Sequence, residues 1–171
     1  MRELILGGVK SGKSQFAENR ALNYQLPVTY IATATAEDHA MQERINQHKK
    51  QRPAGWNVIE EPIKLAQTLN QLKDDKQCVL IDCLTLWMTN LLIKAESQLS
   101  SEIEQLLQSI SIYPHPLIMV SNETNMGILP MDSLTRRYCD EIGKLHQQLG
   151  QCCERVTLVV AGLPMQIKGD A

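Results

Sequence analysis

The turn after the first apolar segment has the composition of a phosphate-binding loop. Its eight residues fit the pattern G-x-x-x-x-G-K-S/T, and they are Gly7, Gly8, Val9, Lys10, Ser11, Gly12, Lys13 and Ser14. Glycines let the backbone turn tightly and aim N–H groups inward, and the helix expected next adds its positive N-terminal end. Lys13 would contact the β- and γ-phosphates of a nucleoside triphosphate, and the Ser14 hydroxyl would bind Mg²⁺. The pattern predicts a nucleotide site, although Lys10 also fits a solvated loop charge.

A second oxygen ligand for the metal ion is expected at Asp82. The apolar residues 78–81 precede it, so its carboxylate would end a buried strand. Phosphate-loop proteins place an acidic metal ligand in this position. Asp82 could instead cap the helix expected from residue 84. We favour the metal role, because the phosphate loop requires such a partner.

A basic segment at residues 44–53 offers a different chemistry. It contains one histidine, His48, before a proline and among four cations, which are Arg44, Lys49, Lys50 and Arg52. A run of cations is usually a solvated helix face. The alternative is a clamp for a triphosphate, with His48 as acid–base catalyst or nucleophile.

The other three histidines have less suggestive surroundings. His115 stands between two prolines and is expected in a loop, and His146 is expected on the surface of a long helix. His39 follows acidic residues and is a further candidate for a functional role. Only His48 is embedded in cations that suit a phosphate.

Segments typical of strands and helices alternate along the chain, and they must position these residues. Short apolar runs predict strands at 4–7, 28–32, 79–82, 117–121 and 156–161, with a weaker one at 57–60. Helical patterns occupy 13–24, 38–51, 63–73, 84–95, 100–111 and 131–150. The alternation predicts one α/β domain over residues 1–171, similar to phosphate-loop NTPases, with a mostly parallel central sheet and helices on both faces. Ligands of such sheets collect at the carboxyl ends of the strands.

Composition excludes several classes of protein. The 171 residues carry a formal net charge of -2, which gives no sign of a nucleic-acid partner. No apolar run approaches a membrane span and no secretory signal is recognised, so a cytoplasmic enzyme is expected. The odd number and scatter of the cysteines argue against disulfides or a zinc site. Cys78 and Cys83, which flank an apolar run, are interpreted as small packing residues.

Beyond the phosphate loop, several distinct motifs follow one another along almost the whole chain. They are Tyr30-Ile31-Ala32-Thr33, Arg44-Ile45-x-x-His48-Lys49-x-x-Arg52-Pro53 with Trp56, Asp82-Cys83-Leu84-Thr85, Thr89-Asn90-Leu91-Leu92, Ser121-Asn122-Glu123-x-x-Met126-Gly127-Ile128-x-Pro130 and Val159-Val160-Ala161-Gly162. With these motifs the chain resembles the bifunctional adenosylcobinamide kinase/adenosylcobinamide-phosphate guanylyltransferase family of cobalamin biosynthesis. The later motifs carry the resemblance, because a phosphate loop alone is common to many families.

The resemblance implies two reactions and a set of partners. An NTP would phosphorylate the aminopropanol hydroxyl of adenosylcobinamide. GTP would then guanylylate a histidine, matched here by His48, and GMP would pass to adenosylcobinamide phosphate to give adenosylcobinamide-GDP. Chemically, a neutral imidazole can attack the α-phosphorus and form a reactive phosphoramidate. The family also implies Mg²⁺ with GTP or ATP, no tightly bound organic cofactor, and a homotrimer.

The resemblance also assigns nucleotide contacts residue by residue. They are Ala32, Thr33 and Ala34 after the second strand, Lys49, Lys50, Gln51 and Arg52 beside the histidine, then Glu60 and Asp82. Glu60 could accept hydrogen bonds from guanine, with its neighbour Glu61 as a rival. Asn122 and Glu123 are plausible substrate contacts, although Asn122 could simply cap a turn.

The chain departs from the family pattern at two positions. Gln47 stands where some members carry a second histidine, and Asn125 stands where glycine is familiar. Asn tolerates left-handed backbone, so the loop is expected to survive. The helix at 84–95 carries a stripe with Trp87 and Met88, for which core, subunit interface and, less favoured, a corrin-binding surface are the alternatives.

Three other functions are weighed against the bifunctional enzyme. One is guanylyltransferase activity alone, and another is an unrelated small-molecule phosphate-loop kinase in which His48 would never be modified. The third is a regulatory GTPase, which should carry N-K-x-D after a late strand. The chain has Ser121-Asn122-Glu123-Thr124 there instead, which argues against this class.

Overall fold

The computed structural model describes residues 1–35, 43, 53 and 55–169. Its elements in chain order are β1 (Arg2–Gly7), α1 (Lys13–Asn23), β2 (Val28–Ala32), β3 (Asn57–Glu60), α3 (Leu65–Leu72), β4 (Cys78–Asp82), α4 (Leu84–Lys94), the 3-10 helix η1 (Glu96–Gln98), α5 (Leu99–Ile112), β5 (Leu117–Asn122), α6 (Ser133–Cys152), β6 (Arg155–Val160) and β7 (Leu163–Lys168). The predicted strands are confirmed, including the weak one at β3. Of the helix expected at 38–51, only residue 43 is among the described residues.

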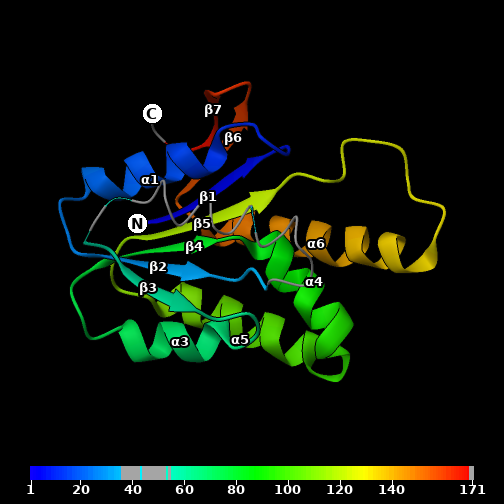
Figure 1. Cartoon of the computed structure of the whole chain (residues 1–171), viewed down its shortest axis with the longest axis horizontal. Helices are drawn as coiled ribbons and strands as arrows, with labels where there is room; N and C mark the ends of the chain where they lie inside the picture. Colours follow the sequence, from blue (N-terminus) through cyan, green and yellow to red (C-terminus); the bar gives the residue numbers. More distant parts are fainter. Residues whose placement is uncertain (36–42, 44–52, 54, 170–171) are drawn as a thin grey trace.

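The strands form one sheet in the order β3-β2-β4-β5-β1-β6-β7. The pairs from β3 through β6 are all parallel, and only β7 runs antiparallel, against β6. Because the parallel strands are in register, their carboxyl ends meet at one edge of the sheet. The predicted α/β fold with a mostly parallel sheet is therefore confirmed (Figure 1).

Successive side chains along the strands enter two different cores, since a strand alternates its faces. On one face, Ile5 of β1 and its equivalents on the other strands pack against Ala17 and Ala21 of α1. On the other face, Leu4 and Leu6 face the layer formed by α3, α4, α5 and α6. Figure 1 shows α1 on one side of the sheet and α3 and α5 on the opposite side. Helices cover both faces, as predicted.

The stripe on α4 belongs to the core. Trp87 and Met88 are fully buried, and the Trp87 indole N–H donates to the Ile63 carbonyl at 2.8 Å. The core interpretation is therefore confirmed for Trp87 and Met88, which form neither a subunit interface nor a corrin-binding surface. The exposed side of the same helix carries Ile93, which is 59% exposed.

Two boundaries differ from the expectation for local reasons. The last long helix begins at Ser133 and not at residue 131, because the Asp132 carboxylate caps it by accepting from the Thr135 N–H at 2.7 Å. The strand β7 is absent from the predicted elements. A two-residue turn at Ala161 and Gly162, both with positive φ, joins it to β6, and this is the backbone of a tight hairpin.

Among the residues that the structure describes, no helix is long and apolar enough to cross a membrane.

Candidate functional site

The phosphate loop wraps the carboxyl end of β1 and enters α1. Gly12 precedes the helix with a φ of 92°, and the Phe16 N–H donates to its carbonyl at 3.0 Å. A Cβ on Gly7 would lie 2.5 Å from Ser11 Oγ and 2.6 Å from the Val159 carbonyl oxygen. At this point the loop therefore tolerates no side chain, whereas Gly8 has nothing within 4 Å of the equivalent position.

Two polar side chains are directed into the loop. Lys13 is buried to 9% exposure, and its Nζ donates to the Gly8 carbonyl at 3.1 Å. The Ser11 hydroxyl is shielded from solvent and makes no hydrogen bond in the described part of the chain. A buried cation and an unused donor beside a helix N-terminus suit an anion. Val9 and Lys10, in contrast, are exposed on the rim of the loop.

Asp82 lies at the carboxyl end of β4 with a fixed orientation. The Tyr30 hydroxyl donates to its Oδ2 at 3.0 Å, and the N-terminus of α4 follows two residues later. The alternative role as a helix cap is not seen, because Cys83 takes the N-cap position and makes no side-chain cap hydrogen bond. The carboxylate thus remains at the ligand-binding edge of the sheet.

Hydrogen bonds of Thr33 link the carboxyl end of β2 to the carboxyl end of β4. Its hydroxyl donates to the Cys83 carbonyl at 2.7 Å and accepts from the Cys83 N–H at 2.9 Å. Asn90 of α4 adds a donation to the Thr33 carbonyl at 2.8 Å. Thr33 is fully buried, so it positions the edge around its neighbours Ala32 and Ala34.

The two rival acids after β3 have different surroundings. Glu60 pairs in register with Ala32 and is exposed at the carboxyl end of the strand. Glu61 Oε1 accepts from the N–H groups of Ile63 and Lys64 at 2.9 and 2.7 Å, just before α3. Glu61 therefore has a structural role, which leaves Glu60 as the candidate for base recognition.

The basic segment lies outside the described residues. It comprises the predicted site residues His48, Lys49, Lys50, Gln51 and Arg52, and His39 and Gln47 lie outside as well. The described site residues, from the phosphate loop through Glu60 to Asp82, meet at the same edge of the sheet.

One histidine lies elsewhere than its surroundings in the sequence indicate. The His146 side chain is only 9% exposed, and its Nε2 lies 2.8 Å from the Ser121 hydroxyl at the end of β5. Its Nδ1 is 3.9 Å from Glu123 Oε2, and Glu123 Oε1 accepts from the Asn125 N–H at 2.8 Å. The expected surface location is wrong, because α6 packs its His146 face against β5. The available signal was spacing, since His146 lies one helical turn after the buried Ile142.

Asn125 also behaves differently from the expectation. Its φ is not positive, so Asn125 does not adopt the left-handed backbone conformation. Instead, its side-chain amide donates to the Cys139 carbonyl on α6 at 2.9 Å. Asn122 is the last residue of β5, pairs with Gly7, and donates its N–H to Thr85 Oγ1 at 2.6 Å.

The two cysteines that flank Asp82's strand are packing residues, as predicted. Both are buried and unpaired. Burial raises the pKa of the Cys78 thiol to about 12 and that of the Cys83 thiol to about 11. Neither is a thiolate at neutral pH, so neither is a nucleophile.

The oxygen donors at this edge fit Mg²⁺. Ser14 lies in the first turn of α1, and Asp82 ends β4 across the sheet edge. Hydroxyl and carboxylate oxygens are the ligands that Mg²⁺ prefers, together with phosphate oxygens of its nucleotide. Within the described residues no cluster of three or more His, Cys, Asp or Glu could hold a metal alone.

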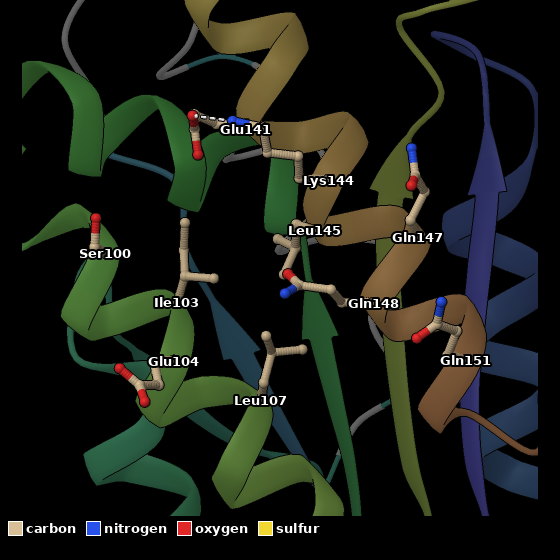
Figure 2. Close-up of a pocket in the computed structure, with 10 residues that line it drawn as sticks. All are labelled: Ser100, Ile103, Glu104, Leu107, Glu141, Lys144, Leu145, Gln147, Gln148 and Gln151. Carbon is tan, nitrogen blue, oxygen red and sulfur yellow. Dashed lines mark hydrogen bonds and ion pairs between the residues drawn. The ribbon is translucent and has the colours of Figure 1, made fainter.

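A separate groove of about 650 Å³ lies between α5 and α6, away from the phosphate loop. Figure 2 shows Ile103 and Leu107 of α5 opposite Leu145 of α6, with Glu141 and Lys144 paired at the rim. All of its lining residues come from these two helices. None belongs to the carboxyl ends of the strands, where the predicted nucleotide site lies.

The contact between Gly7 and its surroundings generates a test of stability. We expect Gly7→Ala to lower the free energy of unfolding by about 1–3 kcal/mol, because the new methyl group overpacks the loop. Gly8→Ala is the matched control and should leave stability equal or slightly higher. Chemical denaturation of both variants measures the difference. Equal stabilities would contradict the close packing of Gly7.

The buried His146 generates a test of pH dependence. Burial lowers the pKa of His146, and Glu123 opposes that shift only in part. The unfolded chain therefore binds a proton at higher pH than the folded chain, so this residue makes stability fall as the pH drops through about 6.5 to the lowered pKa. We expect His146→Gln to flatten the dependence in that window. Parallel curves for the two proteins in chemical denaturation would contradict this.

The comparisons with known proteins agree with this geometry. At the level of fold, the chain is similar to a KaiC-like protein from Pyrococcus horikoshii, with a TM-score of 0.51 and 14% identity over 92% of this chain and 69% of that one. It is also similar to the RadB recombinase, with a TM-score of 0.52 and 17% identity over 92% and 73%. These likenesses support the α/β fold with its mostly parallel sheet.

Sequence relatives are much closer. The chain is 52% identical to the bifunctional adenosylcobalamin biosynthesis protein CobP of Pseudomonas aeruginosa, over 99% of both chains. It is 32% identical to the bifunctional protein CobU of Escherichia coli, over 98% of this chain and 100% of that one. The family model described as cobinamide kinase / cobinamide phosphate guanyltransferase matches residues 3–167. The protein is therefore a nucleotide-using enzyme that belongs to the cobinamide kinase / cobinamide phosphate guanyltransferase family.

Proposed function

We propose that this chain catalyses both reactions for which its family is named. It phosphorylates adenosylcobinamide with an NTP, and it transfers GMP from GTP to adenosylcobinamide phosphate, giving adenosylcobinamide-GDP. The observation that carries the proposal is the meeting of the phosphate loop and Asp82 at one sheet edge, in a chain with the family's motifs throughout. The same edge serves a nucleotide in both reactions.

In the first reaction, the acceptor hydroxyl attacks the γ-phosphorus and a nucleoside diphosphate leaves. Lys13 Nζ donates to the Gly8 carbonyl inside the loop at 3.1 Å. A bound γ-phosphate could replace that carbonyl as the hydrogen-bond partner of Lys13. The loop N–H groups and the N-terminus of α1 stabilise the charge that spreads over the phosphate oxygens. Mg²⁺ held by Ser14 and Asp82 would neutralise further charge on those oxygens.

In the second reaction, His48 attacks the α-phosphorus of GTP. A bond forms between an imidazole nitrogen and phosphorus, the bond to the β-phosphate oxygen breaks, and pyrophosphate leaves. The phosphate of adenosylcobinamide phosphate then displaces the imidazole and takes the GMP. Lys49, Lys50 and Arg52 supply positive charge beside the histidine, and Gln51 adds an amide. Ala32, Thr33, Ala34 and Glu60 would contact the nucleotide, with Glu60 accepting from the guanine N–H groups.

Guanylyltransferase activity alone is the second candidate. An intact phosphate loop does not distinguish this enzyme from the bifunctional one, because the loop could bind GTP in both. The distinction depends on whether adenosylcobinamide is phosphorylated, which the experiment below measures directly.

We also propose a cytoplasmic homotrimer. An exposed apolar row on β7 supports association, since Leu163, Met165 and Ile167 are 72%, 55% and 57% exposed. Contiguous apolar surface of this kind marks contact sites in soluble proteins.

The guanylyl transfer is tested by labelling. Incubation with GTP labelled at the α-phosphate should give a protein adduct that is labile to acid and stable to base. We expect His48→Ala to lose the label and the GMP transfer while it still phosphorylates adenosylcobinamide with ATP or GTP. His115→Ala is the control, because this residue precedes β5 at the opposite edge of the sheet.

Absence of label in wild-type protein that consumes adenosylcobinamide phosphate would sink the covalent step. Labelled protein that never phosphorylates adenosylcobinamide would support the guanylyltransferase alternative.

The oligomer is tested by light scattering. The homotrimer predicts a mass of about 58 kDa, three times the 19.3 kDa chain. We expect Met165→Glu on β7 to reduce that mass, because a charge would be buried in the contact. Leu22→Glu, at a 46% exposed position on α1, is the control. A wild-type mass equal to that of one 19.3 kDa chain would refute the trimer, and an unchanged mass for Met165→Glu would refute β7 as its contact.

A further inference from the structure

A pocket opens between α4 and α6, directly beside the nucleotide edge. We call it the α4–α6 pocket, and its volume is about 360 Å³. Three of its apolar residues are Leu92, Ile93 and Leu134, and three of its hydroxyl residues are Thr85, Thr124 and Tyr138. The nucleotide chemistry described above uses none of these six residues.

Two short hydrogen-bonded connections link the wall of the pocket to the phosphate loop. Thr85 Oγ1 accepts from the Asn122 N–H at 2.6 Å, and Asn122 pairs in register with Gly7. The next residue, Glu123, donates its N–H to the Gly7 carbonyl at 3.1 Å, and Thr124 follows on the pocket wall. A group in this pocket would therefore lie beside the end of β5, which is the neighbour of the strand that carries the phosphate loop.

The lining identifies the kind of group that fits. None of the described lining side chains carries a charge, so they offer nothing to a triphosphate. The Tyr138 hydroxyl is shielded from solvent and lies close to the side chains of Thr85 and Thr124, without the geometry of a regular hydrogen bond in the described part of the chain. Burial raises the pKa of Tyr138, so this hydroxyl is a neutral donor. Apolar walls beside a group of neighbouring hydroxyls suit a neutral ligand that has alkyl and alcohol or amide groups.

We infer that the α4–α6 pocket binds the neutral, alcohol-bearing arm of the corrinoid acceptor, which rests on the proposed function. The pocket has the size of a small-molecule site, so it holds one arm of the large acceptor while the ring stays outside. The apolar residues at the mouth, Ile93 and Leu134, are 59% and 54% exposed and can contact the ring's periphery. Thr85, 7% exposed, lies deeper and is linked through Asn122 to Gly7 of the phosphate loop.

Kinetics with adenosylcobinamide and ATP test this assignment. Tyr138→Phe removes one hydroxyl and keeps the ring, and Ile93→Gln changes an exposed position at the mouth, so both variants should fold. We expect each to raise the KM for adenosylcobinamide about 3- to 10-fold, the effect of one lost hydrogen bond or apolar contact. The KM for ATP and the extent of labelling by GTP, which needs no acceptor, should stay within about twofold. Ile112→Gln on α5, 64% exposed, is the matched control for Ile93→Gln.

The outcomes separate this inference from the proposed function. Wild-type turnover with an unchanged acceptor KM in both variants overturns the pocket assignment alone. A raised KM for ATP, or a changed oligomeric mass in Ile93→Gln, overturns it too, because the pocket would then serve the nucleotide or a contact between copies. Wild-type protein that neither phosphorylates adenosylcobinamide nor becomes labelled overturns the proposed function, and the pocket assignment with it.

Discussion

The close approach of the phosphate loop to the β6–β7 hairpin is the contact on which the site depends. Gly162 in the hairpin turn donates its N–H to the Ser11 carbonyl at 2.8 Å. A Cβ on Gly12 would come within 3.2 Å of the Gly162 Cα, and one on Gly7 would meet the Val159 carbonyl. The backbone of the hairpin thus supports the loop at Gly7, Ser11 and Gly12. An anion-binding loop gains from this support, since donors fixed beforehand need no reorganisation when charge develops.

The neighbouring strands extend this rigid base. The Glu123 N–H donates to the Gly7 carbonyl on one side, and Thr33 bridges the ends of β2 and β4 on the other. Buried His146 then ties α6 to the end of β5 through Ser121. The phosphate loop, the ends of β2, β4 and β5, and α6 are therefore linked in one framework of hydrogen bonds.

Much of this arrangement could be predicted because it depends on local patterns. Contiguous residues determine each of these patterns: the glycines of the loop, the apolar run before Asp82, and the alternation of strands and helices. The β6–β7 hairpin could not be predicted in this way. The sequence indicates it only by the pair Ala161 and Gly162, which precede a strand that contains a proline. The burial of His146 depends on how α6 meets β5, and its helical spacing alone does not reveal that contact. The two glutamates after β3 could be told apart only when Glu61 was seen bonded to the start of α3.

The strand β7 also limits how the sheet can grow. It is an edge strand in the described part of the chain, and such edges can recruit further strands from other molecules. Pro164 removes one N–H donor from it, and a register shift opposite Val156 and Thr157 interrupts its pairing with β6. Both features discourage a foreign strand from adding in line. Copies of this protein that meet at β7 would therefore do so through side chains and would not extend the sheet from one copy to the next.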